Sequence, residues 1–250
     1  MKLYFGKYIE KIINYCYNIN CIVITFMFQK IGECMRIRKK PWAEPELAVC
    51  DFFVKEPRNY RGKWAEQFTK RQPLHLELGC GKCGFAGQMA FLNPDINFMA
   101  VDIKSDMLGV GRRNIVNIFQ NSDREIDNLL LIEQNIEQID MLIAPEDKIE
   151  RIYINFCNPW PRGKHNKRRL TFPKKLKMYR SFLVDGGEIR FKTDDDELFA
   201  DSIEYFKSSG FEITYLTFDL HNSDFTENIM TEHEKMFSAE GKKIKFLIAK

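Results

Sequence analysis

Two carboxylates flank a glycine-rich segment that could hold an adenosine ligand. Gly79, Gly81 and Gly84 form a G-x-G-x-x-G pattern, which lets a ligand approach the backbone closely but fits a dinucleotide equally well. Glu77 lies two residues before this loop, and Asp102 ends the next predicted strand, where a carboxylate accepts hydrogen bonds from ribose hydroxyls. A carboxylate would repel a pyrophosphate and attract a cationic amino-acid end. The pattern therefore favours S-adenosylmethionine over NAD, and the structural alternative for Glu77 is a paired, inward-facing acid.

A rigid turn follows the apolar run at residues 149–156. The turn reads NPWP, residues 158–161, in which the prolines stiffen the backbone and the tryptophan ring offers a face on which a planar base can stack. In open α/β sheets ligand sites lie at the carboxyl ends of strands, which is where this turn falls. We therefore expect a nucleotide site here. The alternative is a proline turn with a core tryptophan.

A dense basic segment comes directly after this turn. Between Arg162 and Lys177 there are eight Lys or Arg residues and no acid, although the whole chain carries a formal charge of only +3. Clustered Lys and Arg side chains neutralise phosphates well, so this segment predicts contact with a nucleic-acid backbone. A solvated surface is the alternative.

Two further segments carry polar side chains at the ends of predicted elements. Asp194 follows a predicted strand beside the same cleft, and its carboxylate could accept hydrogen bonds from guanine N1–H and N2–H. The neighbouring Asp195 and Asp196 fit a helix N-cap and first turn, where acids favour the helix dipole. Residues 231–234, TEHE, fit either a helix cap or part of a site.

Strand and helix patterns alternate along the chain, as in a doubly wound, Rossmann-like α/β fold. Apolar runs predict about seven strands, at residues 74–78, 96–101, 129–132, 149–156, 188–192, 211–218 and 243–248. Helices are predicted at residues 58–70, after the glycine loop through 89–92, and at 105–119, 136–143, 174–183 and 195–208. We expect a mostly parallel sheet with one antiparallel strand near the C-terminus, because a long insertion separates the two closing strands.

The chain is expected to have three parts. Residues 1–34 form an extension that we interpret as lying outside the core, translated from upstream of a natural start at Met35. Its apolar run at 21–28 is too short to span a bilayer, so we expect no membrane association. Residues 35–72 are interpreted as an extended basic arm with a lead-in helix, because two prolines exclude a continuous helix after residues 36–40. Residues 73–250 form the α/β domain.

Cysteine usage indicates the compartment. Seven cysteines, an odd number with irregular spacing, indicate a reducing, cytoplasmic environment. Cys80 and Cys83 form a C-x-x-C that would suit a redox pair or half a zinc site, but no second C-x-x-C or C-x-x-H accompanies it. We therefore expect no metal. The sequence leaves open whether the protein is a monomer or a homodimer.

These motifs together resemble the bacterial tRNA (guanine-N7)-methyltransferases, class I S-adenosylmethionine-dependent enzymes that methylate guanine 46 in the variable loop of tRNA. The resemblance covers residues 35–250 and rests above all on NFCNPWPRGKHNKRRLT, supported by MRIRKKPWAEPEL, LELGCGKCG, RFKTD and TEHE…GKKI. It implies a catalytic Asn158 and the cofactor contacts Glu77, Gly79, Gly81, Asp102, Asn135 and Asn158. It implies the substrate contacts Arg162, Asp194, Thr231, Glu232, His233 and Glu234. It implies the RNA contacts Lys164, His165, Asn166, Lys167, Arg168 and Arg169.

Three positions depart from the pattern of that family. Asn158 stands where many members carry Asp, Cys83 takes the place usually given to the third loop glycine, and Arg162 stands where Lys is usual. Guanine N7 is an unprotonated lone-pair nitrogen, so no base need remove a proton before attack, and an amide oxygen can still stabilise the cationic product. We therefore expect catalysis mostly by in-line positioning.

Two other functions remain compatible with the motifs. A methyltransferase for exocyclic amines of DNA or RNA would also use an N-P-x-x turn, since Asn158 offers an acceptor for the amine. The other alternative is a non-catalytic RNA-binding module on the same fold. RNA binding alone, however, requires neither Glu77, nor Asp102, nor the glycine loop.

Overall fold

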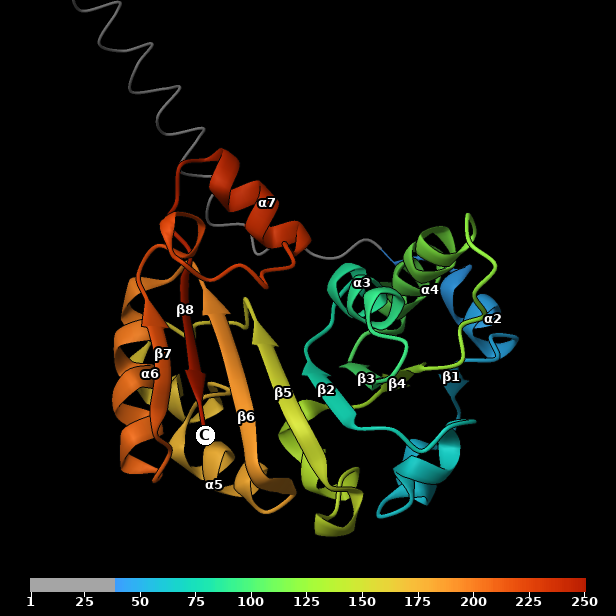
Figure 1. Ribbon diagram of the computed structural model, residues 1–250, viewed down its shortest axis with the longest axis horizontal. Helices are drawn as coiled ribbons and strands as arrows, with labels where there is room; N and C mark the ends of the chain where they lie inside the picture. Colours follow the sequence, from blue (N-terminus) through green and yellow to red (C-terminus); the bar gives the residue numbers. More distant parts are fainter. Residues whose placement is uncertain (1–38) are drawn as a thin grey trace, which may run out of the picture. The chain divides into compact units, whose positions relative to one another are not determined.

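The computed structural model describes residues 39–250 (Figure 1). The expected extension at residues 1–34 and the basic positions Arg36 and Arg38 lie outside the described residues. Within the part of the chain that is described, no helix combines the length and the apolar character that are needed to cross a membrane.

An eight-stranded sheet forms the centre of the fold, in the order β1-β4-β3-β2-β5-β6-β8-β7. The strands are β1 (Phe53–Val54), β2 (Leu74–Leu78), β3 (Asn97–Asp102), β4 (Leu129–Glu133), β5 (Ile149–Asn155), β6 (Leu183–Thr193), β7 (Ile213–Thr217) and β8 (Lys245–Ala249). Strands β1 to β6 pair in parallel, whereas β8 is antiparallel to both β6 and β7. The doubly wound, mostly parallel sheet with one antiparallel strand is thus confirmed. The strand beyond the expected seven is β1, an edge strand of two residues.

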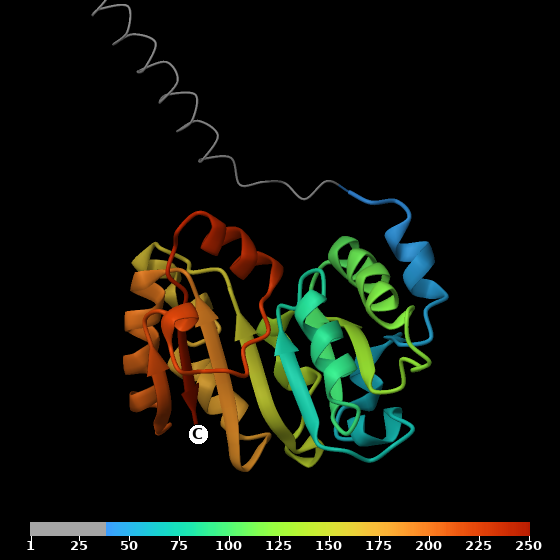
Figure 2. The same ribbon diagram turned by 45° about the horizontal axis from the view of Figure 1, so that its top comes forward.

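Helices cover both faces of this sheet (Figure 2). They are α3 (Gly84–Leu92) and α4 (Ser105–Phe119) on one face, and α5 (Pro173–Arg180) and α6 (Asp196–Ser208) on the other. Strand β2 shows how alternation divides the two cores: Leu74, Leu76 and Leu78 belong to the core with α5 and α6. Since successive strand residues point to opposite faces, His75 and Glu77 face the side of α3 and α4.

The segment expected as an extended arm contains a helix, α2 (Ala43–Ala48). Pro45 lies in its first turn, where the missing N–H breaks no intrahelical hydrogen bond. The helix is held on α4, because Glu46 pairs with Arg113 and the Arg113 guanidinium lies 3.5 Å from the centre of the Trp42 ring. The expectation of an extended arm is therefore wrong for these residues.

Two other predicted helices form 3₁₀ turns instead. The sequence predicts one helix over residues 58–70, but the chain forms η1 (Pro57–Tyr60) and η2 (Trp64–Gln67). Residues 136–143 were also predicted as a helix and contain η3 (Ile136–Met141). A 3₁₀ turn places residues i and i+3 on one side, so the apolar side chains that suggested a helix can still be buried.

The remaining short elements lie in the second half of the chain. They are η4 (Pro145–Asp147), η5 (Gly163–Arg168), η6 (Leu220–Asn222) and α7 (Glu232–Ala239). In Figure 1, α7 lies beyond the arrowheads of β5 and β6, which mark the carboxyl ends of these strands. This is the edge at which open α/β sheets bind their ligands.

Candidate active site

Glu77 is a buried carboxylate near the carboxyl end of β2. Its Oε1 accepts a hydrogen bond from Asn155 Nδ2 at 3.0 Å, and its Oε2 has no hydrogen-bond partner among the described residues. Burial raises the pKa of this carboxyl to about 7, although Asn155 and Lys192 oppose the shift. A buried polar atom without a partner costs free energy, so a donor or a cation facing Oε2 would be bound favourably.

The glycine loop after β2 is tied to Asp102 at the end of β3. Gly79 and Gly81 have positive φ angles of 83° and 53°, which glycine adopts without strain. The Gly81 N–H donates to Asp102 Oδ2 at 2.9 Å, and the Lys104 N–H donates to Oδ1 at 3.0 Å. Asp102 therefore fixes the loop while lying at the strand end where a ribose would be expected.

Cys83 occupies the loop position that usually carries glycine. Its φ of 56° is in the left-handed region, and its side chain is fully buried. The thiol fits because residue 111 in α4 is glycine: a Cβ added to Gly111 would lie 2.5 Å from Cys83 Sγ. Cys80 Sγ lies 3.4 Å from Cys83 Sγ, both are free thiols, and burial raises the pKa of Cys80. The glycine missing from the loop is thus compensated by a glycine in the helix.

A cavity of about 70 Å³ beside Glu77 joins residues that are far apart in the sequence. The glycine loop forms one wall, and Asn155 and Phe156 at the end of β5 form another. The start of α7 forms the third wall. The structure therefore brings together, in this one cavity, the predicted site residues Glu77, Gly79, Gly81, Thr231, Glu232 and His233.

Contacts on two sides hold the start of α7 against this cavity. Glu232 pairs with Lys82 of the glycine loop at 2.9 Å and accepts a hydrogen bond from Asn114 Nδ2 of α4 at 3.3 Å. On the other side, the His233 ring stacks on Phe156, with ring centres 6.1 Å apart and planes at 21°. The start of α7 is thus in contact with the loop, with α4 and with the end of β5.

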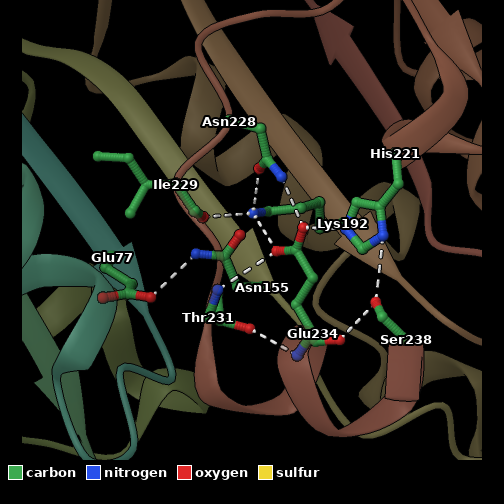
Figure 3. A network of polar contacts seen from close by, with 9 residues as sticks. All are labelled: Glu77, Asn155, Lys192, His221, Asn228, Ile229, Thr231, Glu234 and Ser238. Atoms are coloured by element: carbon green, nitrogen blue, oxygen red, sulfur yellow. Dashed lines mark hydrogen bonds and ion pairs between the residues drawn. The ribbon is translucent and has the colours of Figure 1, made fainter. Parts of the chain in front are cut away.

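A buried ion pair anchors α7 to β6 (Figure 3). The Lys192 ammonium in β6 donates to Glu234 Oε2 at 2.8 Å, to Asn228 Oδ1 at 2.9 Å and to the Ile229 carbonyl at 3.0 Å. His221 Nε2 lies 2.8 Å from Glu234 Oε1, which also accepts from Asn228 Nδ2 at 2.6 Å. Burial alone would raise the pKa of Glu234, but Lys192, Asn228 and His221 outweigh burial and lower it.

Residues 231–234 form a helix cap and also contribute to the cavity. Thr231 Oγ1 accepts from the Glu234 N–H at 3.0 Å, and Glu234 Oε2 accepts from the Thr231 N–H at 3.3 Å. Of the four residues, Glu234 alone does not line the cavity, because its carboxylate is enclosed by protein donors. In this structure Thr231, Glu232 and His233 line the cavity, and Glu234 keeps them in place through its contacts with the protein.

Asn135 lies at the end of β4, beside the end of β3. Its Oδ1 accepts from the Glu137 N–H at 2.9 Å and so caps η3. Together with Ile103, whose side chain is 52% exposed, Asn135 lines a second hollow of about 360 Å³. An exposed apolar side chain next to an amide and the Asp102 carboxylate suits the adenosine part of a ligand.

Asn158 lies in an exposed turn after β5 and does not line the cavity beside Glu77. Its Oδ1 accepts from the Trp160 N–H at 3.0 Å, which stiffens the turn. The Trp160 ring is half-buried, meets the His165 ring edge-on at 5.9 Å, and lies 4.9 Å from the Arg168 guanidinium. The tryptophan therefore packs under the basic segment rather than in the core.

The basic segment mostly faces solvent. Arg162 and three residues of η5, namely Lys164, Lys167 and Arg168, are exposed. His165 and Asn166 are half-buried between them.

Arg169 is the exception, and its predicted contact with RNA needs correction. Its side chain is fully buried, pairs with Glu197 at 2.9 Å and with Asp201, and donates from Nε to the Pro159 carbonyl at 2.7 Å. Both acids lie in α6. The charge of Arg169 is therefore neutralised inside the protein, where it ties the turn to α6.

Asp194 lies at the end of β6, in a different hollow from the glycine loop. This hollow of about 510 Å³ is also lined by Lys242, Lys243 and Lys245. Lys242 Nζ is 3.9 Å from the Asp194 carboxylate, and Lys245 Nζ donates to the Asp194 carbonyl at 2.8 Å. The cap expected at Asp195 is confirmed, since its Oδ1 accepts a backbone N–H of α6 at 2.7 Å.

Sequence reasoning missed Asn155 and Lys192, which the structure places around Glu77 and α7. Lys192 shares one side of β6 with Glu188 and Arg190, which is the alternation of a strand with a polar face, so the sequence gives no signal that this lysine is buried. Asn155 ends an apolar run directly before Phe156 and carries no such signal.

Comparison with known proteins agrees with this arrangement. A family model described as a putative methyltransferase matches residues 71–247. The tRNA (guanine-N(7)-)-methyltransferases of Clostridium beijerinckii and Clostridium perfringens are 57% and 56% identical to this chain, over 86% of it and 98% and 99% of their own lengths. A solved antibiotic-related methyltransferase shares the fold, with a TM-score of 0.57 over 80% of this chain and 97% of that chain at 13% identity. The resemblance noted in the motifs is thus confirmed, and the chain belongs to the tRNA (guanine-N(7)-)-methyltransferase family.

Proposed function

We propose that this protein transfers a methyl group from S-adenosylmethionine to N7 of a guanine in tRNA. Relatives that carry this activity in their names match the chain over nearly their whole lengths, which supports the assignment. The position, guanine 46, follows from the resemblance of the basic motif. The observation that carries the proposal is the unpartnered, buried Oε2 of Glu77 in a cavity shared by the glycine loop and α7.

The residues present fit S-adenosylmethionine, which would supply a methyl group bonded to a positively charged sulfur. Glu77 offers a desolvated carboxylate to a cationic amino-acid end, and the positive-φ glycines allow close approach to the loop. We assign Asp102 to the ribose hydroxyls and Asn135, beside the exposed Ile103, to the adenosine. A pyrophosphate would meet Glu77 instead, and the like charges would repel.

We assign positioning of the target guanine to Asn158. The N7 lone pair needs no base to expose it, so the uncharged amide is sufficient for the reaction. The turn that carries Asn158 is held by its own hydrogen bond to Trp160 and, through Pro159, by the buried Arg169. An orienting group on a stiff turn suits a reaction that depends on alignment.

We assign the remaining substrate contacts to the cationic and polar groups around the carboxyl edge. Arg162, Lys164, Lys167 and Arg168 face solvent and would hold phosphates, while Asp194 and residues 231–233 would contact the nucleoside. The cysteines that the structure describes are free thiols, which agrees with a reducing cytoplasm.

A methyl-transfer assay on unmodified tRNA tests this function. Tritium from labelled S-adenosylmethionine should appear in 7-methylguanosine after nuclease digestion, and replacing guanine 46 should abolish the signal. Label in an N-methylated exocyclic amine would instead indicate an amino-methyltransferase. Cofactor binding with no incorporation would indicate a non-catalytic RNA-binding module.

A further inference from the structure

A further hollow, of about 540 Å³, lies between η3, η5 and the start of α5. Its lining includes Lys167 and Arg168 from the basic segment, together with Lys174 and Lys175 from α5. Phe172 contributes apolar surface between the two pairs of cations. None of these positions lines the cavity beside Glu77. The hollow is thus continuous with the segment that we assign to RNA but separate from the cavity.

Most cations of this region form no ion pair with the protein. Between residues 162 and 177, among the described residues, only Arg169 forms an ion pair. The hollow at Asp194 behaves differently, because Lys242, Lys243 and Lys245 each pair with a carboxylate there. A cluster of unpaired like charges repels itself and attracts an anionic partner. Of the two hollows, the one beside α5 therefore suits a polyanion.

Two acids on the opposite wall shape what the hollow can bind. Glu137 and Asp140 belong to η3 and line it, and Lys175 Nζ donates to the Glu137 carbonyl at 2.8 Å. A phosphate would therefore lie on the side of Lys167, Arg168 and Lys174, away from the carboxylates. Hydroxyl or amino donors of a nucleotide could face the acids, which a simple anion could not do.

We propose that this hollow binds the ribose-phosphate backbone of the tRNA substrate, with Lys174 as a direct phosphate contact. The inference rests on the proposed function, because it assumes a tRNA whose target guanine lies at the carboxyl edge. The RNA strand that crosses Lys164, Lys167 and Arg168 continues along the start of α5. The hollow extends the RNA surface beyond residues 164–168 and adds to affinity without touching the reacting base.

Lys174 and Lys177 provide a matched pair of variants. Both are exposed lysines on α5, separated by three residues, and neither forms an ion pair or hydrogen bond among the described residues. Lys174 lines the hollow and Lys177 does not. Lys174→Ala and Lys174→Glu change one exposed side chain without breaking a contact, so both variants should fold like the parent. Lys177→Ala and Lys177→Glu change the net charge equally.

The experiment measures tRNA affinity against salt concentration for each variant, with S-adenosylmethionine affinity as a control. Loss of one phosphate contact should lower the salt slope by about one unit and weaken binding at 0.1 M salt by roughly five- to tenfold. We expect this for Lys174→Ala, a larger loss for Lys174→Glu, and a smaller change for the two Lys177 variants. Cofactor affinity should stay constant throughout.

Two results would overturn the inference. If Lys174→Glu binds tRNA like the parent, the hollow holds no phosphate. If Lys174→Glu and Lys177→Glu weaken binding equally, the positive charge of α5 as a whole attracts the RNA and the hollow makes no specific contact. If either result is found while the parent protein still methylates tRNA, the proposed function stays intact and only the role of the hollow is lost. Parent protein that neither binds nor methylates tRNA would remove both.

Discussion

Affinity for S-adenosylmethionine should rise with pH toward 7, because Glu77 must be ionised to bind a cation. Burial raises the pKa of Glu77 in the folded protein to about 7, well above that of an exposed carboxyl group. Below this pH most of the free protein carries the neutral carboxylic acid, so binding a cation beside Oε2 releases a proton. A ligand that binds only the ionised form weakens as the pH falls.

The magnitude follows from the fraction ionised. With a pKa of about 7, roughly 3% of Glu77 is ionised at pH 5.5 and about 50% at pH 7, so the apparent dissociation constant should be on the order of 15-fold larger at pH 5.5. Glu77→Gln keeps the size and one acceptor but removes the charge. Since hydrogen bonds to charged groups contribute about 1.5–3 kcal/mol, this variant should bind roughly 10- to 100-fold more weakly at pH 7.

Calorimetric titration between pH 5.5 and 7 provides the measurement, since an α-amino group with a pKa of about 8 stays charged over this range. Repeating it in buffers of different ionisation enthalpy counts the proton released. The informative quantity is the difference between parent and Glu77→Gln, because the two proteins differ only in the carboxyl group at position 77. Affinity that does not depend on pH in the parent, or a dependence that persists unchanged in Glu77→Gln, would refute the reasoning.

Substitutions at Asn158, Lys192 and Arg169 test the remaining assignments. Asn158→Ala should lower the methylation rate by on the order of 10- to 100-fold because it loses the orienting amide, whereas Asn158→Asp should stay much closer to the parent; full activity in both variants would rule out the role. Lys192→Met should lower the free energy of unfolding by about 3–5 kcal/mol, because it leaves Glu234 buried without its partner, and Lys192→Met with Glu234→Gln should recover part of that loss in urea titrations. If the single and double variants are equally unstable, the pair does not act as a unit. Arg169→Ala should lower the free energy of unfolding by about 1–3 kcal/mol, less than Lys192→Met, because the acidic partners of Arg169 are partly exposed. It should leave the salt slope of tRNA binding unchanged. A reduced slope in a variant as stable as the parent would show that Arg169 does contact RNA.

Most of the sheet could be predicted from the sequence, because the inner strands either are short apolar runs or alternate apolar with polar residues, and polar turns bound them. β1 could not, because two residues show no period and pair only through β4 at the edge. The predicted helix at residues 58–70 shows a second limit. Burial at a spacing of three or four residues is common to α-helices and 3₁₀ turns, so the pattern alone does not distinguish them.

The sequence predicts the site residues that lie at strand ends, but it does not predict which side chains pair with one another across the fold. Glu77 and Asp102 stand out because their strands end beside them. The pairing of Lys192 with Glu234 joins positions 42 residues apart in the sequence and depends on how α7 packs. Arg169 reads as one more cation in a basic run, since the acids that neutralise it belong to a helix almost thirty residues further along the chain.

Because Cys83 packs against Gly111, a substitution at one of these two positions limits which residues the other can carry. A side chain at 111 is excluded while the thiol is present, because its Cβ would lie 2.5 Å from the sulfur. Changing Cys83 to glycine would relieve the positive φ and open a space that a small residue at 111 could then fill. The two steps are therefore ordered: residue 83 must become smaller before residue 111 becomes larger. A lineage that started from the opposite step would pass through a chain with a disrupted glycine loop, so the allowed intermediate between the two loop sequences has glycine at both positions.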